Sequence, residues 1–490
     1  MKGAFYWVML IIIVLFMVSC NNPKTTSQLD DVSLQSAATQ LQDNLPEITD
    51  KLAICMYASV PGPSLWRDAI DNFREKYPDI EVTIEYIYPT TFLTNLKAEE
   101  TGDESLKMGP EAHIQRIETE ILSGHGADIL LLTVHSDRMA QLFPDMNKVA
   151  LSGVFLDLNP YMNGGGLIDP DDCFGNIITA ASLSGQQSYL PLSFDVPIVL
   201  STQANLNSIG FDISRAQMGI HEFEEELYQK LPEDQQWVYS PRDMRFSVAN
   251  TKTIDYETKT TNFDNAEIRS LFERQKNSGL KWQRDARFFE SRDNFWALSE
   301  ADRAQQLIEG NPLMMIGAMY PAVIQARYAQ RLTYNGVEPV IFPINNEEGG
   351  LTASICDFAA IRANSENAGT ALLLLKYLLS KEVQGAHGYP TAHALPVRRD
   401  ALADNLELAK TVSSLGSVSG LASLSDQFVE DMIKSLDKIS DIQFQNIYLV
   451  AQKIGSVDIA HTIDEYYIDK ITYEQMVEIV EPELQFYLYE

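Results

Sequence analysis

Cysteine is scarce in this 490-residue chain, and so is positive charge. Apart from Cys20, the cysteines are Cys55, Cys173 and Cys356, an odd and widely spaced set that does not form a disulfide framework. We predict that each of these three is a small buried side chain. Lysine and arginine total 37 against 68 acidic residues, for a formal net charge of -31. Such a surface repels nucleic-acid phosphates and anionic lipid headgroups, so neither is an expected partner.

Motifs of several common enzyme classes are also missing. The sequence has no P-loop, no glycine-rich dinucleotide fingerprint after a strand, no GxSxG elbow and no HExxH helix. The seven histidines show no metal-ligand spacing, and DPDDCFGN at 169–176 lacks the glycine and glutamate of a calcium loop. We therefore predict no catalytic residue, no metal and no cofactor. Acidic pairs are frequent enough that a glycosidase pair stays open as an alternative.

The only long apolar run lies at the amino terminus. Lys2 is followed by apolar residues 4–18, which are shorter than the roughly 20 residues of a membrane span. A basic start, an apolar core and a small residue before the break describe a secretory signal. The final MVSC resembles the lipobox of bacterial lipoproteins, which implies a signal peptide at 1–19 and lipid on Cys20. The alternative is an uncleaved signal anchor. Polar residues 20–50 then form a flexible tether.

A chain of 490 residues exceeds what one hydrophobic core normally supports, so at least two lobes are expected. Near the start, two strand-like segments (51–59 and 80–87) alternate with two amphipathic helical segments (64–77 and 111–124). This order indicates a parallel sheet covered by helices. The residues that mark the helical faces are Trp66, Ile70, Phe73 and Tyr77 in the first helix and Ile114, Ile117 and Ile121 in the second.

The stretch GHGADILLLTVHSD at 124–137 predicts the next strand, a buried apolar run after a glycine-rich turn. Ligands of open parallel sheets lie outside the carboxyl ends of the strands. We therefore predict ligand contacts from the polar tip of this run and from the end of the first strand. A plainer alternative is that Ser136 caps a following helix. The predicted residues are Thr133, His135, Ser136 and Asp137 at the tip, and Tyr57 and Ser59 after the first strand.

Two later segments also carry structural signals. Residues 185–202 are typical of a strand but contain two prolines, and such a segment could cross between lobes. Near the carboxyl terminus, Thr472 and Gln475 have the spacing of a capping box at a helix start. Pro482 is expected to kink that helix.

Several blocks, taken in order, resemble a known family. These are LWRDAIDNFREKYPDIEVTIEY, ILSGHGADILLL, SGVFLDLNPYM, YLPLSFDVPIVL, LIEGNPLMMIGAMYPA, ANSENAGTALLLLKYLLSKEVQ and ALPVRRDAL. Together they resemble the extracellular solute-binding proteins of the maltodextrin-binding type, which serve bacterial carbohydrate importers of the ATP-binding-cassette (ABC) class. The resemblance extends over roughly residues 50–400.

The resemblance implies an α/β fold of the type II periplasmic-binding-protein kind. Its two lobes are open, mostly parallel sheets covered by helices, with a hinge between them. Residues 51–190 and 335–380 are expected in lobe 1, and residues 191–334 and 381–490 in lobe 2. The implied function is a monomeric, lipid-anchored receptor on the extracellular face of the membrane. It captures a carbohydrate between its lobes and delivers it to the membrane subunits of an ABC importer, without enzymatic activity.

The resemblance also suggests two binding residues. Asp195 matches a carboxylate position that often accepts sugar hydroxyls, and Tyr320 lies in a block that commonly presents an aromatic platform. Carboxylates bind paired hydroxyls and aromatic rings cover sugar faces. The chain departs from the family where tryptophan is frequent in the Tyr320 block, and where Ser201-Thr202 replaces Tyr-Asn. The class of sugar therefore stays open. The alternatives are a secreted carbohydrate-active enzyme and a same-fold receptor for a non-sugar solute.

Overall fold

The computed structural model describes residues 46–57, 65–87, 110–133, 142–212, 253–276, 299–317, 331–385, 394–404, 434–443 and 459–489, apart from short gaps, and a few isolated residues at 219–230 and 430. Its strands are β1 (Lys51–Tyr57), β2 (Glu81–Ile87), β3 (Ile129–Thr133), β4 (Leu190–Asp195), β5 (Ile198–Thr202), β6 (Ile254–Asp255), β7 (Thr260–Thr261), β8 (Met314–Gly317), β9 (Pro339–Pro343), β10 (Leu351–Ile361), β11 (Leu395–Pro396) and β12 (Ile439–Gln443). Its α-helices are α3 (Leu65–Lys76), α6 (Pro110–Leu122), α8 (Met146–Leu151), α9 (Gly175–Ala180), α10 (Gln203–Ser208), α15 (Glu300–Ile308), α17 (Ala368–Leu378), α18 (Lys381–Gln384), α23 (Ile459–Tyr467) and α24 (Tyr473–Tyr489).

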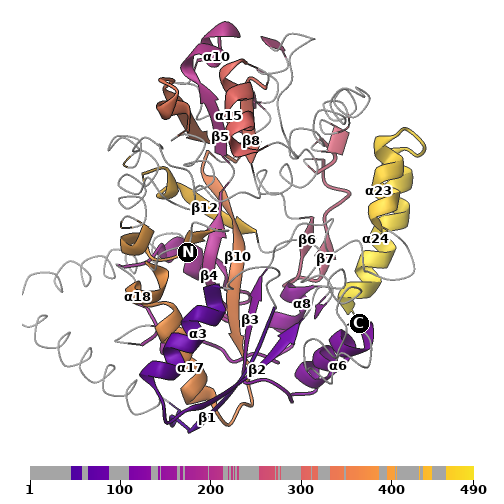
Figure 1. Cartoon of the computed structure of the whole chain (residues 1–490). Helices are drawn as coiled ribbons and strands as arrows, with labels where there is room; N and C mark the ends of the chain where they lie inside the picture. Colours follow the sequence, from indigo (N-terminus) through magenta and orange to yellow (C-terminus); the bar gives the residue numbers. More distant parts are fainter. Residues whose placement is uncertain are drawn as a thin grey trace, which may run out of the picture. The chain divides into compact units, whose positions relative to one another are not determined.

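Seven of the described strands form the larger sheet, in the order β11-β4-β10-β3-β1-β2, with β12 paired to β10 (Figure 1). β1 is parallel to β2 and β3, whereas β10 is antiparallel to both β3 and β4. β1 to β4 therefore run in one direction, and β10 and β12 run in the other. The sheet is more mixed than the mostly parallel sheet expected from the sequence, because β10 enters it directly from another sheet.

That other sheet has three strands in the order β8-β5-β9, all antiparallel. Two stretches of chain connect the sheets, since β5 follows β4 and β10 follows β9. Asp195 at the end of β4 is the Cα partner of Ser354 near the start of β10, and Ile198 at the start of β5 is the partner of Pro343 at the end of β9. The two connections therefore leave the larger sheet side by side. A crossing at the segment with two prolines is what the sequence predicts.

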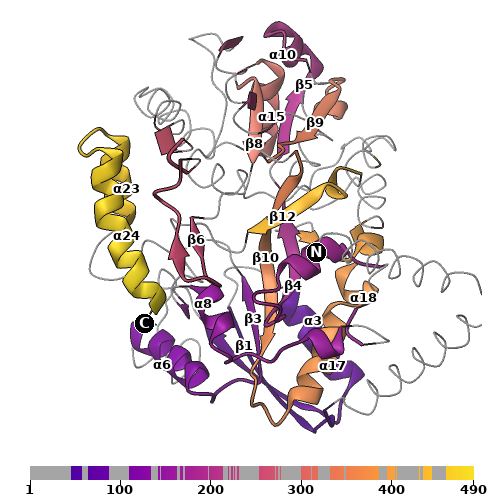
Figure 2. The same ribbon diagram turned by 180° about the vertical axis from the view of Figure 1, so that it is seen from behind.

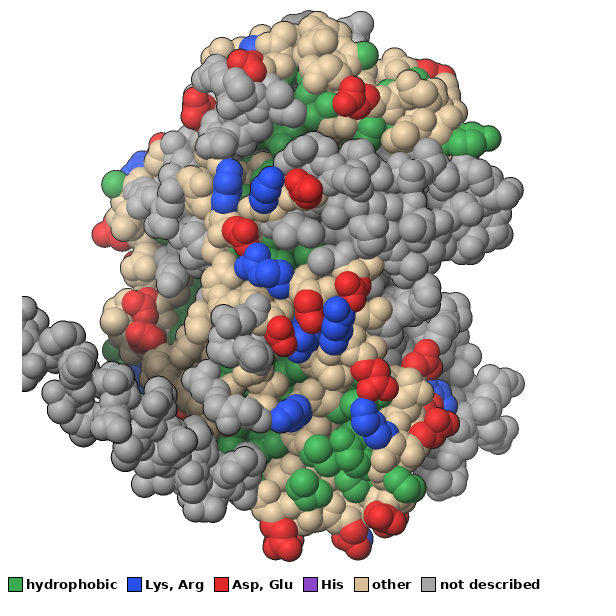
Figure 3. Space-filling view, turned by 90° about the vertical axis from the view of Figure 1, so that its left-hand side faces the viewer, with side chains coloured by type: hydrophobic (Ala, Val, Ile, Leu, Met, Phe, Trp, Pro, Cys, Tyr) green, Lys and Arg blue, Asp and Glu red, His purple; other side chains and the backbone are tan. Residues whose placement is uncertain are grey.

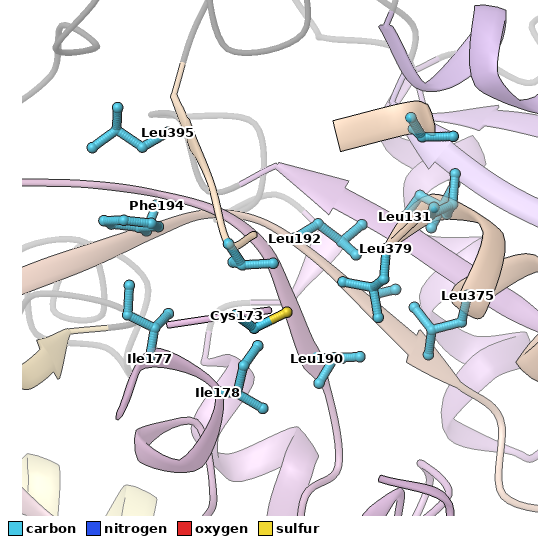
Figure 4. Close-up of a cluster of buried hydrophobic side chains, with 14 of the residues drawn as sticks. Leu131, Cys173, Ile177, Ile178, Leu190, Leu192, Phe194, Leu375, Leu379 and Leu395 are labelled. Atoms are coloured by element: carbon cyan, nitrogen blue, oxygen red, sulfur yellow. The ribbon is translucent and has the colours of Figure 1, made fainter. Parts of the chain in front are cut away.

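β4 lies in the centre of the main hydrophobic core. Leu190, Leu192 and Phe194 point into a cluster that also contains side chains of α9 and α17 (Figure 4). Strand side chains alternate between two faces. Ser193 and Asp195 therefore lie on the other face of β4, and neither belongs to this hydrophobic cluster.

The helical faces predicted from the sequence are the buried ones. Trp66, Ile70 and Phe73 of α3 join the main core. The three isoleucines of α6 join a second cluster with Leu130 and Leu132 of β3. The structure also confirms the prediction for Cys55, Cys173 and Cys356, which are all buried free thiols.

Strand pairing does not follow the predicted lobe boundaries everywhere. β4, β11 and β12 pair within the larger sheet, although most of their residues lie in ranges predicted for lobe 2. Figure 2 shows β4 and β12 beside β10. β9 pairs within the smaller sheet, although its range was predicted for lobe 1. Sheet pairing alone does not define lobes, so the boundaries stay a prediction.

The surface of the described part mixes both signs of charge. Acidic and basic side chains are interspersed on the face shown in Figure 3. Ion pairs such as Lys76–Glu382 (2.8 Å) and Lys381–Asp404 (2.8 Å) join neighbouring helices and loops. Exposed pairs of this kind add little stability. No helix among the described residues has both the length and the apolar character needed to cross a membrane.

Candidate functional site

Three of the predicted ligand-binding residues lie at one edge of the larger sheet. Tyr57 ends β1, Thr133 ends β3 and Asp195 ends β4. β1 and β3 are parallel, and β3 and β4 are both antiparallel to β10, so these three carboxyl ends meet at the same edge. This is the edge where ligands of open α/β sheets bind.

A hydrogen-bonded network of three side chains joins the strands at this edge. The hydroxyl of Thr133 donates to Oδ1 of Asp357 (2.6 Å), and the hydroxyl of Ser193 donates to Oδ2 of the same carboxylate (2.5 Å). The backbone N–H of Asp357 in turn donates to Oγ of Ser193 (3.0 Å). The Asp357 side chain therefore links β3 and β4 through β10. Thr133, which is only half-buried, keeps lone pairs that can accept from a ligand hydroxyl.

Asp195 differs from Asp357 because only one of its two carboxylate oxygens has a hydrogen-bond partner among the described residues. It is 2% exposed, and its Oδ1 accepts from the backbone N–H of Val196 (2.8 Å). Among the described residues, Oδ2 has no hydrogen-bond partner. Burial raises the pKa of Asp195 well above its ordinary value. A buried acceptor without a partner costs about 1–3 kcal/mol, which a ligand hydroxyl could recover.

The thiol next to this network is not suited to nucleophilic chemistry. Cys356 is buried beside Asp195 and Asp357. Burial, and then the two carboxylates, raise the pKa of this thiol well above its ordinary value. The reactive thiolate form is therefore disfavoured.

The remaining predicted residues contribute less to the observed geometry. Tyr57 is buried in the cluster that contains Cys55 and Leu132, so its ring belongs mainly to the core. The others lie outside the described residues: Ser59, His135, Ser136, Asp137, Tyr320 and the predicted lipidation site Cys20.

Sequence reasoning missed Asp357 and Ser193. A signal for Asp357 exists, because it interrupts the apolar run ASICDFAAI, and a carboxylate in a buried strand needs partners. Nothing local indicates Ser193 as its partner, since 164 positions separate the two residues.

A surface groove of about 470 Å³ lies elsewhere, at the turn between α23 and α24. Arg269 in this groove pairs with Glu273 (2.9 Å) and Glu474 (2.6 Å), and Lys276 pairs with Asp469 (2.7 Å). The positive charges of these two side chains are thus already balanced, and we do not place the ligand there. No group of three or more His, Cys, Asp or Glu within the described ranges is arranged to hold a metal ion.

Comparisons with solved structures identify the architecture. A sugar-binding protein MalE from Xanthomonas citri matches with a TM-score of 0.55 and 13% identity, over 90% of this chain and 97% of its own. An ABC substrate-binding protein from Listeria monocytogenes, solved with cycloalternan, matches with a TM-score of 0.54 and 13% identity, over 90% and 99%. The chain has the fold of the solute-binding proteins. In that two-lobe α/β fold, β4–β5 and β9–β10 are the connections between the two sheets.

Other comparisons add less. No protein-family model matches the chain, and a sequence comparison finds no match among curated proteins. A de novo designed cysteine esterase also matches in structure, with a TM-score of 0.56 and 14% identity, over 90% of this chain and 99% of its own. The solute-binding fold therefore does not by itself decide between binding and catalysis.

Proposed function

We propose that this protein is a solute receptor that captures a neutral sugar or oligosaccharide and delivers it to the membrane subunits of an ABC importer. The fold and the sugar-binding proteins that share it support this proposal. The site lies between the lobes, where the carboxyl ends of β3 and β4 meet. Hinge closure brings the second lobe onto the ligand, and the closed form is what the importer recognises.

The unused Oδ2 of Asp195 is the observation that carries the proposal. It is a buried polar atom with no partner among the described residues, at the edge where ligands of such sheets bind. A ligand hydroxyl at Oδ2 would satisfy it, and a second hydroxyl could donate to Oγ1 of Thr133. Asp195 is buried here, so the ligand reaches it only when the surrounding side chains separate, as they do in hinge opening.

Calorimetric titration with maltotriose, mannotriose and cellotriose tests the role of Asp195. Replacing Asp195 by alanine is expected to weaken binding by about 1–3 kcal/mol, the cost of leaving a buried ligand hydroxyl without its hydrogen-bond partner. Asp437→Ala is the matched control, because Asp437 is an exposed carboxylate paired with Arg399. Equal affinities of wild type and Asp195→Ala for the sugar that binds would remove Asp195 from the site.

The proposal extends to the location of the protein. Its signal peptide and the lipid on Cys20 would tether a monomer to the extracellular face of the cell membrane, with residues 20–50 as the link. The second candidate function is a carbohydrate-active hydrolase on the same fold. The structural match to a designed esterase favours keeping this candidate, because it shows that the fold can carry an enzyme. A hydrolase would release shorter sugars during long incubation, whereas a receptor returns its ligand intact.

A further inference from the structure

The C-terminal helix α24 belongs to the core of the smaller sheet. Its buried side chains Met476, Val480 and Leu484 lie in one cluster with Val199 of β5 and Phe342 of β9. The helix begins with the predicted capping box, since the N–H of Thr472 donates to Oε1 of Gln475 (2.9 Å) and the N–H of Gln475 donates to Oγ1 of Thr472 (3.3 Å). α24 therefore moves with the smaller sheet in any hinge motion.

The last turn of α24 binds α8, which packs on the larger sheet instead. Met146 and Ala150 of α8 lie in the cluster that contains Leu130 of β3. Nζ of Lys148 on α8 donates to the backbone carbonyl of Tyr487 (2.5 Å) and lies 4.0 Å from the centroid of the Tyr487 ring. Both ribbon views place the end of α24 near α8 (Figures 1 and 2). A cation at a helix C-terminus and over an aromatic ring is favourable on both counts.

The β6–β7 hairpin makes a second contact between elements fixed to the smaller sheet and residues on the side of the larger sheet. It is tied to α24, because Nε2 of Gln485 donates to the carbonyl of Lys259 (2.8 Å) and Oγ1 of Thr261 donates to Glu481 (3.2 Å). Its turn reaches residues near the larger sheet, where the N–H of Ser184 donates to Oε1 of Glu257 (2.7 Å).

The hairpin turn also meets the N-cap of α8. Asp145 accepts from the N–H groups of Asn147 and Lys148 at the start of that helix. The phenol of Tyr256 interacts with the Asp145 carboxylate, and burial followed by this charge raises the pKa of Tyr256 well above its ordinary value. Tyr256, Glu257 and Tyr487 thus reach the larger sheet's side from elements fixed to the smaller one.

We propose that α24 and the β6–β7 hairpin form a latch that sets the hinge equilibrium. The latch consists of Lys148 with Tyr487 and of Ser184 with Glu257. The connections β4–β5 and β9–β10 are covalent and stay in place at any hinge angle, whereas the latch is held by a few polar contacts that hinge motion must break. The strength of these polar contacts then sets the fraction of molecules in which the two sheets are separated. This holds whatever the ligand is, so the proposal is independent of the sugar-receptor function.

Spin-label distance measurements without added ligand test the latch. Labels are placed at Ala204→Cys on α10 and Glu366→Cys before α17, both exposed positions, in a Cys20→Ala background. The other native cysteines are buried and do not compete for label. Lys148→Met is expected to change the ratio of the two populations, with short and with long distances between the labels, by roughly fivefold. This is the lower limit of the coupling that is typical between two sites of a protein. Adding Glu257→Ala is expected to enlarge the change.

Lys76→Met is the matched control. Lys76 also makes an ion pair, with Glu382 at 2.8 Å, and lies 5.0 Å from the ring centroid of Tyr377, but all three residues lie on α3, α17 and α18 beside the larger sheet. This variant is expected to keep the wild-type distances. An unchanged distribution in the Lys148→Met, Glu257→Ala double variant overturns the latch, and so does an equal change in the control. If Lys148→Met fails to fold by circular dichroism, Glu257→Ala alone decides in the same way.

Discussion

The hydroxyl of Thr133 donates a 2.6 Å hydrogen bond to the carboxylate of Asp357, which joins the end of β3 to the middle of the sheet. Asp357 is 9% exposed and accepts from Ser193 with its other oxygen. One carboxylate thereby fixes the hydroxyls of two strands that border the proposed binding site. In the proposed site, the hydrogen bond to Asp357 would position the Thr133 hydroxyl for a ligand, and Asp195 would supply its second carboxylate oxygen.

Replacing Asp357 by alanine is expected to lower the free energy of unfolding by about 1–3 kcal/mol. The loss arises because the buried Ser193 hydroxyl, and in part that of Thr133, are left without their acceptor. Urea denaturation of the purified variant measures it. Asp437→Ala, which removes an exposed carboxylate, is expected to change stability by less than about 1 kcal/mol. A smaller loss for Asp357→Ala than for Asp437→Ala would contradict the assigned role of the network.

A larger effect is expected at the opposite edge of the sheet, where Asp128 is buried. Its carboxylate accepts from the backbone N–H of Ala53 (2.8 Å), from Arg362 (3.3 Å), from Ser365 (2.7 Å) and from Asn367 (3.0 Å). Asp128→Ala leaves the mostly buried Arg362 without its counter-charge, and the expected loss of stability is about 3–5 kcal/mol. Guanidinium denaturation measures this loss. A loss below about 1 kcal/mol would show that the hydrogen bonds and the ion pair of Asp128 contribute little to the stability of the fold.

Asp195 makes a pH-dependent contribution to stability. Burial raises its pKa well above the ordinary value, so the folded protein keeps this proton at a pH where the unfolded chain has released it. The stabilisation is fully present below about pH 3.9, the pKa of an unfolded aspartate, and is lost as the pH rises through the folded pKa. Asp195→Asn has no such charge to bury.

The unfolding free energy of Asp195→Asn, relative to wild type, is therefore expected to increase from about pH 4 to about pH 7. Urea titrations at four or more pH values measure this difference. Asp437→Asn, which alters an exposed carboxylate, serves as the control for a general effect of lost charge. A difference between Asp195→Asn and wild type that does not change with pH would contradict a raised pKa of the buried Asp195.

Cys20→Ala tests the proposed anchor. In a bacterial host, the wild-type protein is expected to incorporate radiolabelled palmitate and to fractionate with membranes. The variant is expected to lose the label, because the lipidated side chain is gone. Absence of label on the wild type would overturn the lipid anchor and favour an uncleaved signal anchor.

Local patterns predicted much of the fold. Ile114, Ile117 and Ile121 face the core because their spacing defines one side of a helix, and Thr472 caps α24 because its partner Gln475 is three residues away. Pairings between distant segments left no such signal. β12 joins β10, and β9 joins β5, through contacts that the whole fold determines.

The residues of the candidate site also differ in whether the sequence carries a signal for them. Thr133 was predicted because it ends an apolar strand, and ligands of such sheets bind at strand ends. Asp195 was predicted from the family resemblance of its block, and the structure then shows that it ends β4. Asp357 was not predicted, because its strand runs in the opposite direction and carries the residue in its interior. Its role depends on a register between β3, β10 and β4 that sequence periodicity does not specify.

Thermal unfolding with a panel of neutral sugars tests the central claim most directly. A ligand that binds only the folded state raises the unfolding midpoint, so one or more sugars of the panel are expected to raise that of the wild type. Chromatography after long incubation is expected to recover the same sugar unchanged. A panel in which no sugar raises the midpoint, or in which the bound sugar is cleaved, would contradict a receptor that holds a neutral sugar intact.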